Sequence, residues 1–164
     1  MSLNSELAKS VADLLKAKDI KLVLAESCTG GKVSGKLVEI PGISEHLCGS
    51  FVVYRVPSKT GWLDIPQDIF EKFTAESQQS ASAISRSALA KTPEADISLG
   101  VAGFEDGNFW ISINQRLADD TIIEVHKIEL PAIGGTRPQR LKNIVTHCLS
   151  HIAIVLNSVL KCKK

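Results

Sequence analysis

The apolar and polar residues near the amino terminus follow two different periods. Leu7, Val11, Leu14 and Leu15 fall on one face of a helix, and a short apolar run follows at residues 20–25. A run of this length, rich in branched residues and ended by polar and glycine residues, is typical of a buried strand. We therefore expect an amino-terminal helix followed by a first strand.

The next part of the chain predicts a second helix and a second strand. Residues 30–40 have helical character and end at Pro41-Gly42, a pair that stops a helix. The segment CGSFVVYRV at residues 48–56 is apolar enough for a buried strand. A turn at Pro57-Ser58 would then lead into residues 59–63.

Two helices and a third strand come next. Residues 66–73 begin with proline and acidic residues, which is typical of a helix start, and residues 76–90 form a longer pattern rich in Ala and Ser. A face of small residues permits close packing. Residues 95–102 (ADISLGVA) predict a buried strand that ends at Gly103.

The last part of the chain predicts a hairpin and a long helix. Residues 108–117 and 121–130 alternate on either side of Ala118-Asp119-Asp120, and residues 137–160 carry a continuous apolar stripe. Strands separated by helices pair in parallel, whereas a hairpin adds antiparallel members. The order of elements thus predicts one α/β domain over residues 1–164, a three-layer α/β/α domain with a mixed sheet.

Composition limits the functions open to this chain. It has 164 residues, 44% of them apolar, which suffice for the core of one domain. The 19 basic and 18 acidic residues give a net charge of +1, which argues against nonspecific electrostatic binding of nucleic acid or a membrane. With no apolar run of about 18 residues and an amphipathic amino terminus, we expect a cytoplasmic protein.

The cysteines favour neither a metal site nor a disulfide framework. Cys28, Cys48, Cys148 and Cys162 contain no CxxC pair and no regular spacing. We expect reduced thiols, most of them buried, and no bound metal.

The stretch AESCTGGKVSGKL at residues 25–37 carries the candidate chemistry. Gly30 and Gly35-Lys36 have the spacing of a phosphate-binding P-loop, but Leu37 stands where that loop needs Ser or Thr. Lys59-Thr60-Gly61 spells an element of the serine β-lactamases, yet no Ser-x-x-Lys nucleophile motif precedes it. We interpret both matches as coincidence.

A third interpretation makes Ser27 a nucleophile at the end of a strand. The backbone amides of Thr29, Gly30 and Gly31 would follow it as a helix amino terminus, suited to an anion or an oxyanion. A serine hydroxyl needs a base to take its proton. None of the histidines stands in a loop beside other polar groups, and we expect them to be solvated or capping residues: His46, His126, His147 and His151.

A lysine can replace histidine as the base where a partly desolvated site lowers its pKa. Lys59 follows the second strand, five residues after Tyr54. Because the carboxyl ends of parallel strands meet at one edge of a sheet, Ser27, Tyr54 and Lys59 could converge there. The alternatives are a surface lysine and a half-buried strand tyrosine.

Several motifs occur in order over nearly the whole chain: AESCTGG at 25–31, PGIS at 41–44, Gly49 to Lys59, ESQQSA at 76–81, GVAG at 100–103, and Arg137 at the start of the last helix. Together they resemble the CinA C-terminal domain family of nicotinamide mononucleotide deamidases. The AESCTGG motif is highly specific, and the other motifs support the resemblance by occurring in the same order along the chain.

The resemblance implies an activity and a set of site residues. The family hydrolyses the carboxamide of nicotinamide mononucleotide to nicotinate mononucleotide and ammonia, without metal or cofactor. Ser27 would attack the amide, Lys59 would act as the base, and Tyr54 would orient or relay the proton. The implied ligand-binding positions are Glu26, Thr29, Gly30, Gly31, Gly100, Gly103 and Arg137, with Arg137 meeting the phosphate. A homodimer or higher homo-oligomer is also implied, with Phe109 or Trp110 of the hairpin at the interface or in the core.

The sequence departs from the family pattern beside the expected ligand. Leu99 and Phe104 replace a threonine and a proline, and Glu105-Asp106-Gly107 is all that remains of a glycine-rich loop. This acidic turn would repel a phosphate if it faced the site. Gly135-Thr136 precedes Arg137 where Gly-Asp is usual. Two hypotheses follow: a deamidase that holds its nucleotide differently, or a paralogue with lost or shifted activity that serves as a ligand-binding or interaction module.

Overall fold

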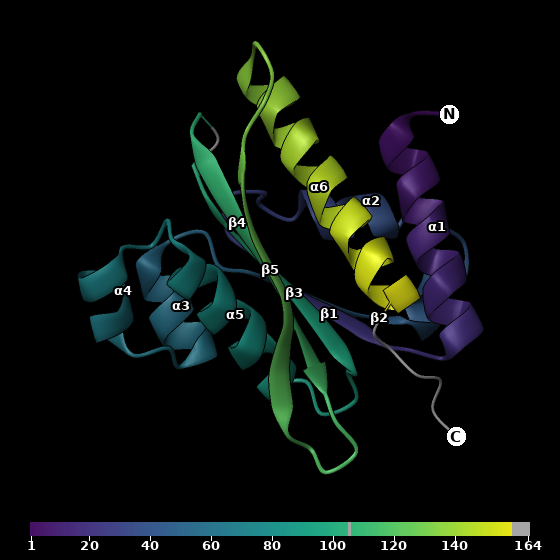
Figure 1. Cartoon of the computed structure of the whole chain (residues 1–164), viewed down its shortest axis with the longest axis horizontal. Coiled ribbons are helices and arrows are strands. Elements are labelled where there is room, and N and C mark those ends of the chain that lie inside the picture. Colours follow the sequence, from purple (N-terminus) through teal and green to yellow (C-terminus); the bar gives the residue numbers. More distant parts are fainter. Residues whose placement is uncertain (105, 159–164) are drawn as a thin grey trace.

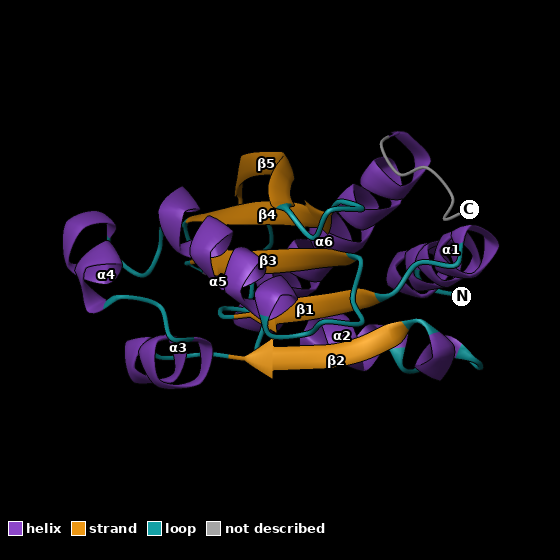
Figure 2. Ribbon diagram, turned by 90° about the horizontal axis from the view of Figure 1, so that it is seen from below, coloured by secondary structure: helices purple, strands orange, loops and turns teal. Residues whose placement is uncertain are grey.

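The chain folds around one mixed sheet with helices on both faces. The structure, a computed structural model, describes residues 1–104 and 106–158. Within these residues, one helical layer lies on each side of the sheet (Figure 1 and Figure 2). The expected three-layer α/β/α architecture is confirmed.

The sheet has the strand order β2-β1-β3-β4-β5. Strand β1 (Leu22–Glu26) lies between β2 (Leu47–Val52) and β3 (Ile97–Gly103) and pairs in parallel with both. The antiparallel strands β4 (Asn108–Arg116) and β5 (Ile122–Pro131) form the expected hairpin at the other edge. The carboxyl ends of β1, β2 and β3 therefore meet at one edge, as the positions of Ser27, Tyr54 and Lys59 require.

One helical layer consists of α1 (Leu3–Lys18), α2 (Lys32–Leu37) and α6 (Arg137–Ser158), and α1 and α6 lie side by side in it (Figure 1). Its core contains Leu22 and Leu24, on alternate positions of β1. Among the described residues, none of the helices combines the length and the apolar character that a bilayer crossing needs.

The other layer consists of α3 (Val56–Leu63), α4 (Gln67–Phe73) and α5 (Gln78–Ala90), and a 3₁₀ turn (Ile43–Glu45) precedes β2. The remaining alternate residues of β1 pack here. A strand buried on both faces is mostly apolar, and all five residues of β1 are buried. Its first four residues are apolar, and the fifth, Glu26, is satisfied by hydrogen bonds.

The second strand is shorter than expected, and this moves the candidate base onto a helix. Strand β2 ends at Val52, and α3 begins at Val56. Pro57 lies in the first helical turn, where its fixed φ and missing N–H are tolerated, and a capping box links Arg55 and Ser58. The expected turn at Pro57-Ser58 was thus wrong, because the proline starts a helix there.

The second helix is also shorter than the predicted span of residues 30–40. Gly30 and Gly31 have φ angles of +57° and +93°, in the left-handed region that favours glycine, so they belong to the turn before α2. At the other end of the chain, α6 is described to Ser158, and Leu160 and Cys162 lie outside the described residues.

Candidate active site

Ser27 and Lys59 are in direct contact, as proposed from their positions. Lys59 Nζ donates a hydrogen bond to Ser27 Oγ across 2.9 Å, and it lies 3.4 Å from the carbonyl oxygen of Tyr54. Ser27 follows β1 directly, and its amide donates to the Val101 carbonyl of β3 at 3.0 Å. This bond extends the hydrogen-bond ladder between β1 and β3 by one residue and fixes the backbone of Ser27. Lys59 projects from α3 into the same place and is only 1% exposed.

Burial makes Lys59 a stronger candidate base than a surface lysine. Desolvation lowers the pKa of Lys59 below its ordinary value of 10.5, while the negative charge of Glu76 opposes the shift. A lower pKa raises the neutral fraction of the amine near neutral pH. Only the neutral amine can take the proton of Ser27, so this environment suits general-base catalysis.

A buried carboxylate shapes the turn that carries Ser27. Glu26 is fully buried, and its oxygens accept hydrogen bonds from Thr29 Oγ1, the Val33 amide and Ser50 Oγ, each at 2.8 Å. Ser34 adds its amide at 3.2 Å and its hydroxyl at 2.8 Å. These bonds tie β1, the turn, α2 and β2 together. Glu26 and Thr29 shape the loop from within and do not line the pocket at Ser27.

The amides after Ser27 are not all available for an oxyanion. Gly30 donates its amide to the Ser27 carbonyl at 3.1 Å, so that donor is used within the turn. In the described part of the chain, the amides of Thr29 and Gly31 make no such bond. These two amides are the remaining backbone candidates for binding a developing negative charge.

The Ser27 hydroxyl opens into a pocket of about 270 Å³. Its lining brings together Ser27, Tyr54, Gly103 and Arg137 from the expected site. Arg137 Nη2 donates to Tyr54 Oη at 3.4 Å. Because Tyr54 is 57% exposed, its ring stands at the mouth of the pocket, where it can cover a bound ligand.

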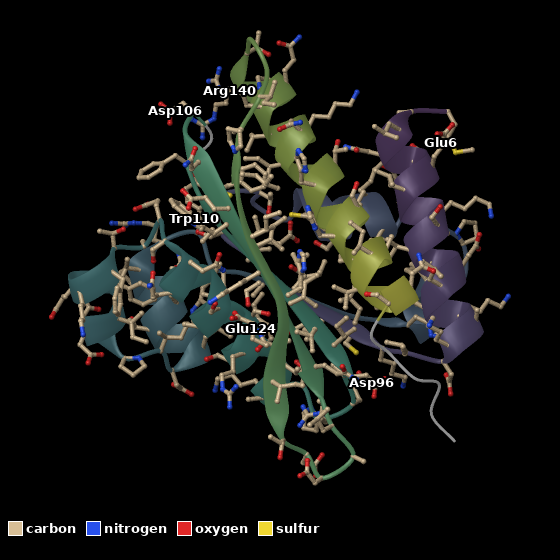
Figure 3. The ribbon with its side chains drawn as sticks, viewed as in Figure 1. Glu6, Asp96, Asp106, Trp110, Glu124 and Arg140 are labelled. Atoms are coloured by element: carbon tan, nitrogen blue, oxygen red, sulfur yellow. The ribbon has the colours of Figure 1, made fainter. Side chains whose placement is uncertain are left out.

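The same pocket contains residues outside the expected set of site residues. Glu76, from the segment before α5, and Asp106, from the turn between β3 and β4, both line it, with Cys28 and Phe104. Figure 3 shows Asp106 at the tip of that turn, near the end of the sheet where α6 begins. Asp106 of the acidic turn thus does face the site. No signal in the sequence marked Glu76 beyond its place in the ESQQSA motif.

Two neighbouring positions lie elsewhere than the resemblance implied. Gly100 is not in the pocket; it permits the close approach of α5, because a Cβ there would lie 2.4 Å from the Ala81 carbonyl oxygen. Leu99 is fully buried in the core beneath α1 and α6. Leu99, which stands where the family pattern has threonine, is therefore not part of the lining of the pocket at Ser27.

The expectation of solvated or capping histidines was wrong for three of the four. His126 of β5 and His147 and His151 of α6 are half-buried, with His126 Nε2 2.9 Å from His151 Nδ1. The rings of His147 and His151 stack at 6.2 Å. Burial lowers the pKa of each, that of His151 to about 4. They pack between β5 and α6 and do not line the pocket.

Metal-binding side chains are not clustered in the part of the chain that the structure describes. There, no three or more His, Cys, Asp or Glu side chains are arranged to hold an ion. The groups gathered at Ser27 are instead a hydroxyl, an amine, a phenol, carboxylates and a guanidinium. This set suits acid–base and nucleophilic chemistry.

Comparison with known proteins places this site in a family. The model of the CinA C-terminal domain matches residues 4–114, which include Ser27, Tyr54 and Lys59. The chain belongs to the CinA C-terminal domain family. The CinA match ends within β4, so it does not include Arg137.

CinA-like proteins are among the similar curated sequences. That of Dictyoglomus thermophilum is 40% identical over 106 residues, covering 63% of this chain and 26% of that protein. That of Pseudothermotoga lettingae is 40% identical over 100 residues, covering 61% and 24%. The alignments thus cover about a quarter of the length of these relatives.

Solved structures of CinA proteins share the fold over almost the whole chain. The competence damage-inducible protein A of Klebsiella pneumoniae has a TM-score of 0.86 at 22% identity, covering 96% of this chain and 99% of that one. The competence/damage inducible protein of Agrobacterium tumefaciens has a TM-score of 0.82 at 25% identity, covering 96% and 98%. The CinA fold therefore extends beyond the sequence match and includes α6.

Proposed function

We propose that this protein is an amidohydrolase that deamidates nicotinamide mononucleotide to nicotinate mononucleotide, a step of pyridine nucleotide salvage in the cytoplasm. The observation that carries the proposal is the contact of 2.9 Å between Lys59 Nζ and Ser27 Oγ, beside a pocket. A serine hydroxyl held against a buried amine of lowered pKa is an activated nucleophile.

The reaction proceeds through an acyl-enzyme. Ser27 Oγ attacks the carboxamide carbon while neutral Lys59 takes the hydroxyl proton, and the resulting oxyanion needs donors such as the amides of Thr29 and Gly31. Collapse of the tetrahedral intermediate breaks the C–N bond as Lys59 returns the proton to the leaving nitrogen, releasing ammonia. Lys59 then takes a proton from a water molecule that attacks the Ser27 ester. The C–O bond to Ser27 breaks, Lys59 returns the proton to Ser27 Oγ, and the product loses its acidic proton to solvent and leaves as the carboxylate.

Tyr54 and Arg137 support this chemistry from the mouth of the pocket. The hydrogen bond from Arg137 to Tyr54 Oη fixes the phenol relative to the opening of the site. In this position Tyr54 orients the substrate or relays a proton, and its ring can exclude water when the ligand is bound. Gly103 lines the opening with φ of +147°, and its lack of a side chain permits the close approach of β4, because a Cβ there would lie 2.4 Å from Phe109 Cα.

A CinA paralogue with lost or shifted deamidase activity, acting as a ligand-binding or interaction module, is the second candidate. It is favoured by the two carboxylates, Glu76 and Asp106, that line the pocket. Carboxylates oppose a phosphate placed there.

Ammonia release from nicotinamide mononucleotide by the purified protein tests the proposal. We expect Ser27→Ala and Lys59→Ala each to lower kcat by about 10³-fold or more, because each removes half of a unit that acts together. Ser10→Ala, on the exposed face of α1, is the matched control and should leave kcat unchanged.

Activity that survives both site substitutions would contradict the mechanism. Absence of ammonia release from the parent protein, with binding of nicotinamide mononucleotide retained, would instead favour the paralogue.

Self-association is a separate proposal, based on the family resemblance alone. Phe109 is fully buried in the core, so it cannot form an interface, whereas Trp110 is partly exposed beside α5. We expect a homodimer or higher homo-oligomer. Light scattering coupled to size exclusion would measure it, and a monomer at micromolar concentration would contradict it.

A further inference from the structure

A groove of about 800 Å³ lies between α1, α2 and α6, beside the turn that carries Ser27. We call it the α1–α2–α6 groove and define it by its polar and charged lining: Asn4 of α1, Lys32, Lys36 and Glu39 on and after α2, and Arg137 and Lys142 of α6. It is about three times the volume of the pocket at Ser27. A ligand in that small pocket thus has a large open volume next to it.

The groove concentrates positive charge on a nearly neutral protein. Four basic side chains line it against one acidic side chain, while the whole chain carries a net charge of +1. Lys36 is paired with Glu39 at 2.7 Å. Within the described residues, the ammonium groups of Lys32 and Lys142 have no ionic partner. Such a groove attracts an anion.

The groove and the pocket at Ser27 share a border. Arg137 lines both of them. Gly30 and Gly31, in the turn that begins at Ser27, line the groove. A single ligand can therefore have one end at the Ser27 hydroxyl and the other beyond Arg137, among the lysines.

The charges of the two cavities differ in a way that orients such a ligand. Glu76 and Asp106 line the pocket at Ser27, so a phosphate is repelled there and a cationic ring is attracted. Nicotinamide mononucleotide has a pyridinium ring that carries the carboxamide and a phosphate at its far end. Its two charges match the acidic pocket and the basic groove, respectively.

We propose that the α1–α2–α6 groove binds the phosphate-bearing arm of the substrate whose carboxamide enters the pocket at Ser27. This proposal rests on the deamidase function proposed above and adds Lys32 and Lys142 as specificity-determining residues. The substrate class is then a cationic carboxamide ring with an anionic arm. The groove supplies the phosphate contacts that the shortened acidic turn cannot supply.

Steady-state kinetics on two substrates test the proposal. Nicotinamide mononucleotide and nicotinamide riboside share the ring and differ by the phosphate. For the mononucleotide, we expect Lys32→Gln and Lys142→Gln each to raise KM by roughly fivefold, the effect of about 1 kcal/mol for an exposed charge. The KM for the riboside and kcat for both substrates should not change.

Lys127→Gln is the matched control, because it removes the same charge from exposed β5, outside both cavities. Both groove lysines are exposed, so their substitution should leave the melting temperature unchanged. Inorganic phosphate should compete with the mononucleotide in the parent protein, and less so in the double variant. The parent KM for the mononucleotide should also rise with salt.

The outcomes separate the groove from the deamidase function. An unchanged KM for the mononucleotide in the Lys32→Gln/Lys142→Gln variant, with ammonia still released, would overturn the groove and leave the deamidase intact. If neither substrate releases ammonia, the deamidase fails, and calorimetric binding of the mononucleotide to Ser27→Ala tests the groove alone. Weaker binding after the two groove substitutions, but not after Lys127→Gln, would then support the groove, and equal binding would overturn it.

Discussion

A lysine side chain usually keeps its ammonium group in water, yet Lys59 is 1% exposed and hydrogen-bonds a hydroxyl instead of a carboxylate. Burial of a cation without a paired anion is unfavourable, and the protein responds with a lowered pKa. The same desolvation thus destabilises the fold and favours the neutral amine that the proposed mechanism requires. Two predictions at the scale of single residues follow from this.

The first concerns stability. We expect Lys59→Met to abolish ammonia release and to raise the free energy of unfolding at neutral pH by about 1 to 3 kcal/mol, because an apolar side chain of similar length replaces a buried amine. Since the folded pKa is lowered, the unfolded state binds more protons between that pKa and 10.5. The destabilisation of the parent protein by the buried ammonium group is thus complete below the pKa of Lys59 in the folded state, and it shrinks as the pH rises toward 10.5.

Urea unfolding at about pH 6 and about pH 10 measures this, and the gain should be smaller at the higher pH. A variant less stable than the parent at both pH values would show that the amine stabilises the fold.

The second concerns the pH dependence of catalysis. Activity should rise with pH as Lys59 loses its proton, because the neutral amine is the base in the proposed mechanism. Glu76 opposes the lowering of that pKa through its negative charge. We expect Glu76→Gln to lower the Lys59 pKa further and to move the rising part of the pH–kcat profile to lower pH. Glu71→Gln, on exposed α4, should leave the profile in place; a shift to higher pH in Glu76→Gln would contradict the assignment.

At the scale of secondary-structure elements, the approach of α5 to β3 depends on small residues. Gly100 faces the helix at a point where a Cβ would lie 2.4 Å from the Ala81 carbonyl oxygen and 2.7 Å from Ser85 Cβ. Below Gly100, Ser85 and Ser98 hydroxyls lie 2.9 Å apart and are fully buried. Small polar residues thus fill the interface between α5 and β3. Strand β3 ends at Gly103, which lines the pocket at Ser27.

Substitution at this interface should be costly. We expect Gly100→Ala to destabilise the protein by about 1 to 3 kcal/mol, because the added methyl group meets backbone atoms that cannot move aside. Gly61→Ala is the control, since no atom lies within 4 Å of its added Cβ in α3 and an alanine favours a helix. Urea unfolding compares the two variants. A Gly100→Ala variant as stable as Gly61→Ala would show that α5 can shift outward without loss.

At the scale of the whole molecule, the histidines link the hairpin to the carboxyl-terminal helix. His126 lies on the edge strand β5, and His147 and His151 lie on α6; the rings of Phe109 and His147 are tilted at 50° to each other, with their centroids 5.7 Å apart. Burial, and to a smaller extent the charges of His126 and His147, lower the pKa of His151 to about 4. A neutral cluster therefore holds the outer strand against α6.

Acid should weaken the whole fold through this cluster. Because the folded pKa values are lowered, the unfolded state binds more protons once the pH falls below the ordinary value of 6.5. The contribution to stability is complete above about pH 6.5 and is lost as the pH falls toward about 4. Thermal unfolding across this range should show a falling melting temperature.

His151→Phe should flatten that dependence, because it removes the group with the largest shift and keeps a ring in place. His46→Gln, outside the cluster, should keep the slope of the parent. A slope that is unchanged in His151→Phe would exclude the cluster as its source.

Much of this organisation could be predicted from the sequence. The apolar runs at β1 and β3, the hairpin and the long helix depend on near neighbours in the chain, so their periods predict the three-layer α/β/α fold. The AESCTGG motif places Ser27 at the end of β1 for the same local reason. The end of β2 was mispredicted, because the apolar residues Val53 and Val56 extend the pattern of a strand whereas Pro57 starts a helix.

The tertiary structure alone decided what surrounds Ser27. The burial of Lys59, the entry of Glu76 and Asp106 into the pocket, and the meeting of His126 with His151 join residues far apart in the chain. Desolvation and electrostatic interactions depend on distances in space. The pKa values and the sign of the charge around each cavity are therefore set only when the helical layers pack on the sheet. Local sequence patterns therefore specify the fold and place Ser27 at the end of β1, whereas the packing of the layers lowers the pKa of Lys59 and sets the charges around each cavity.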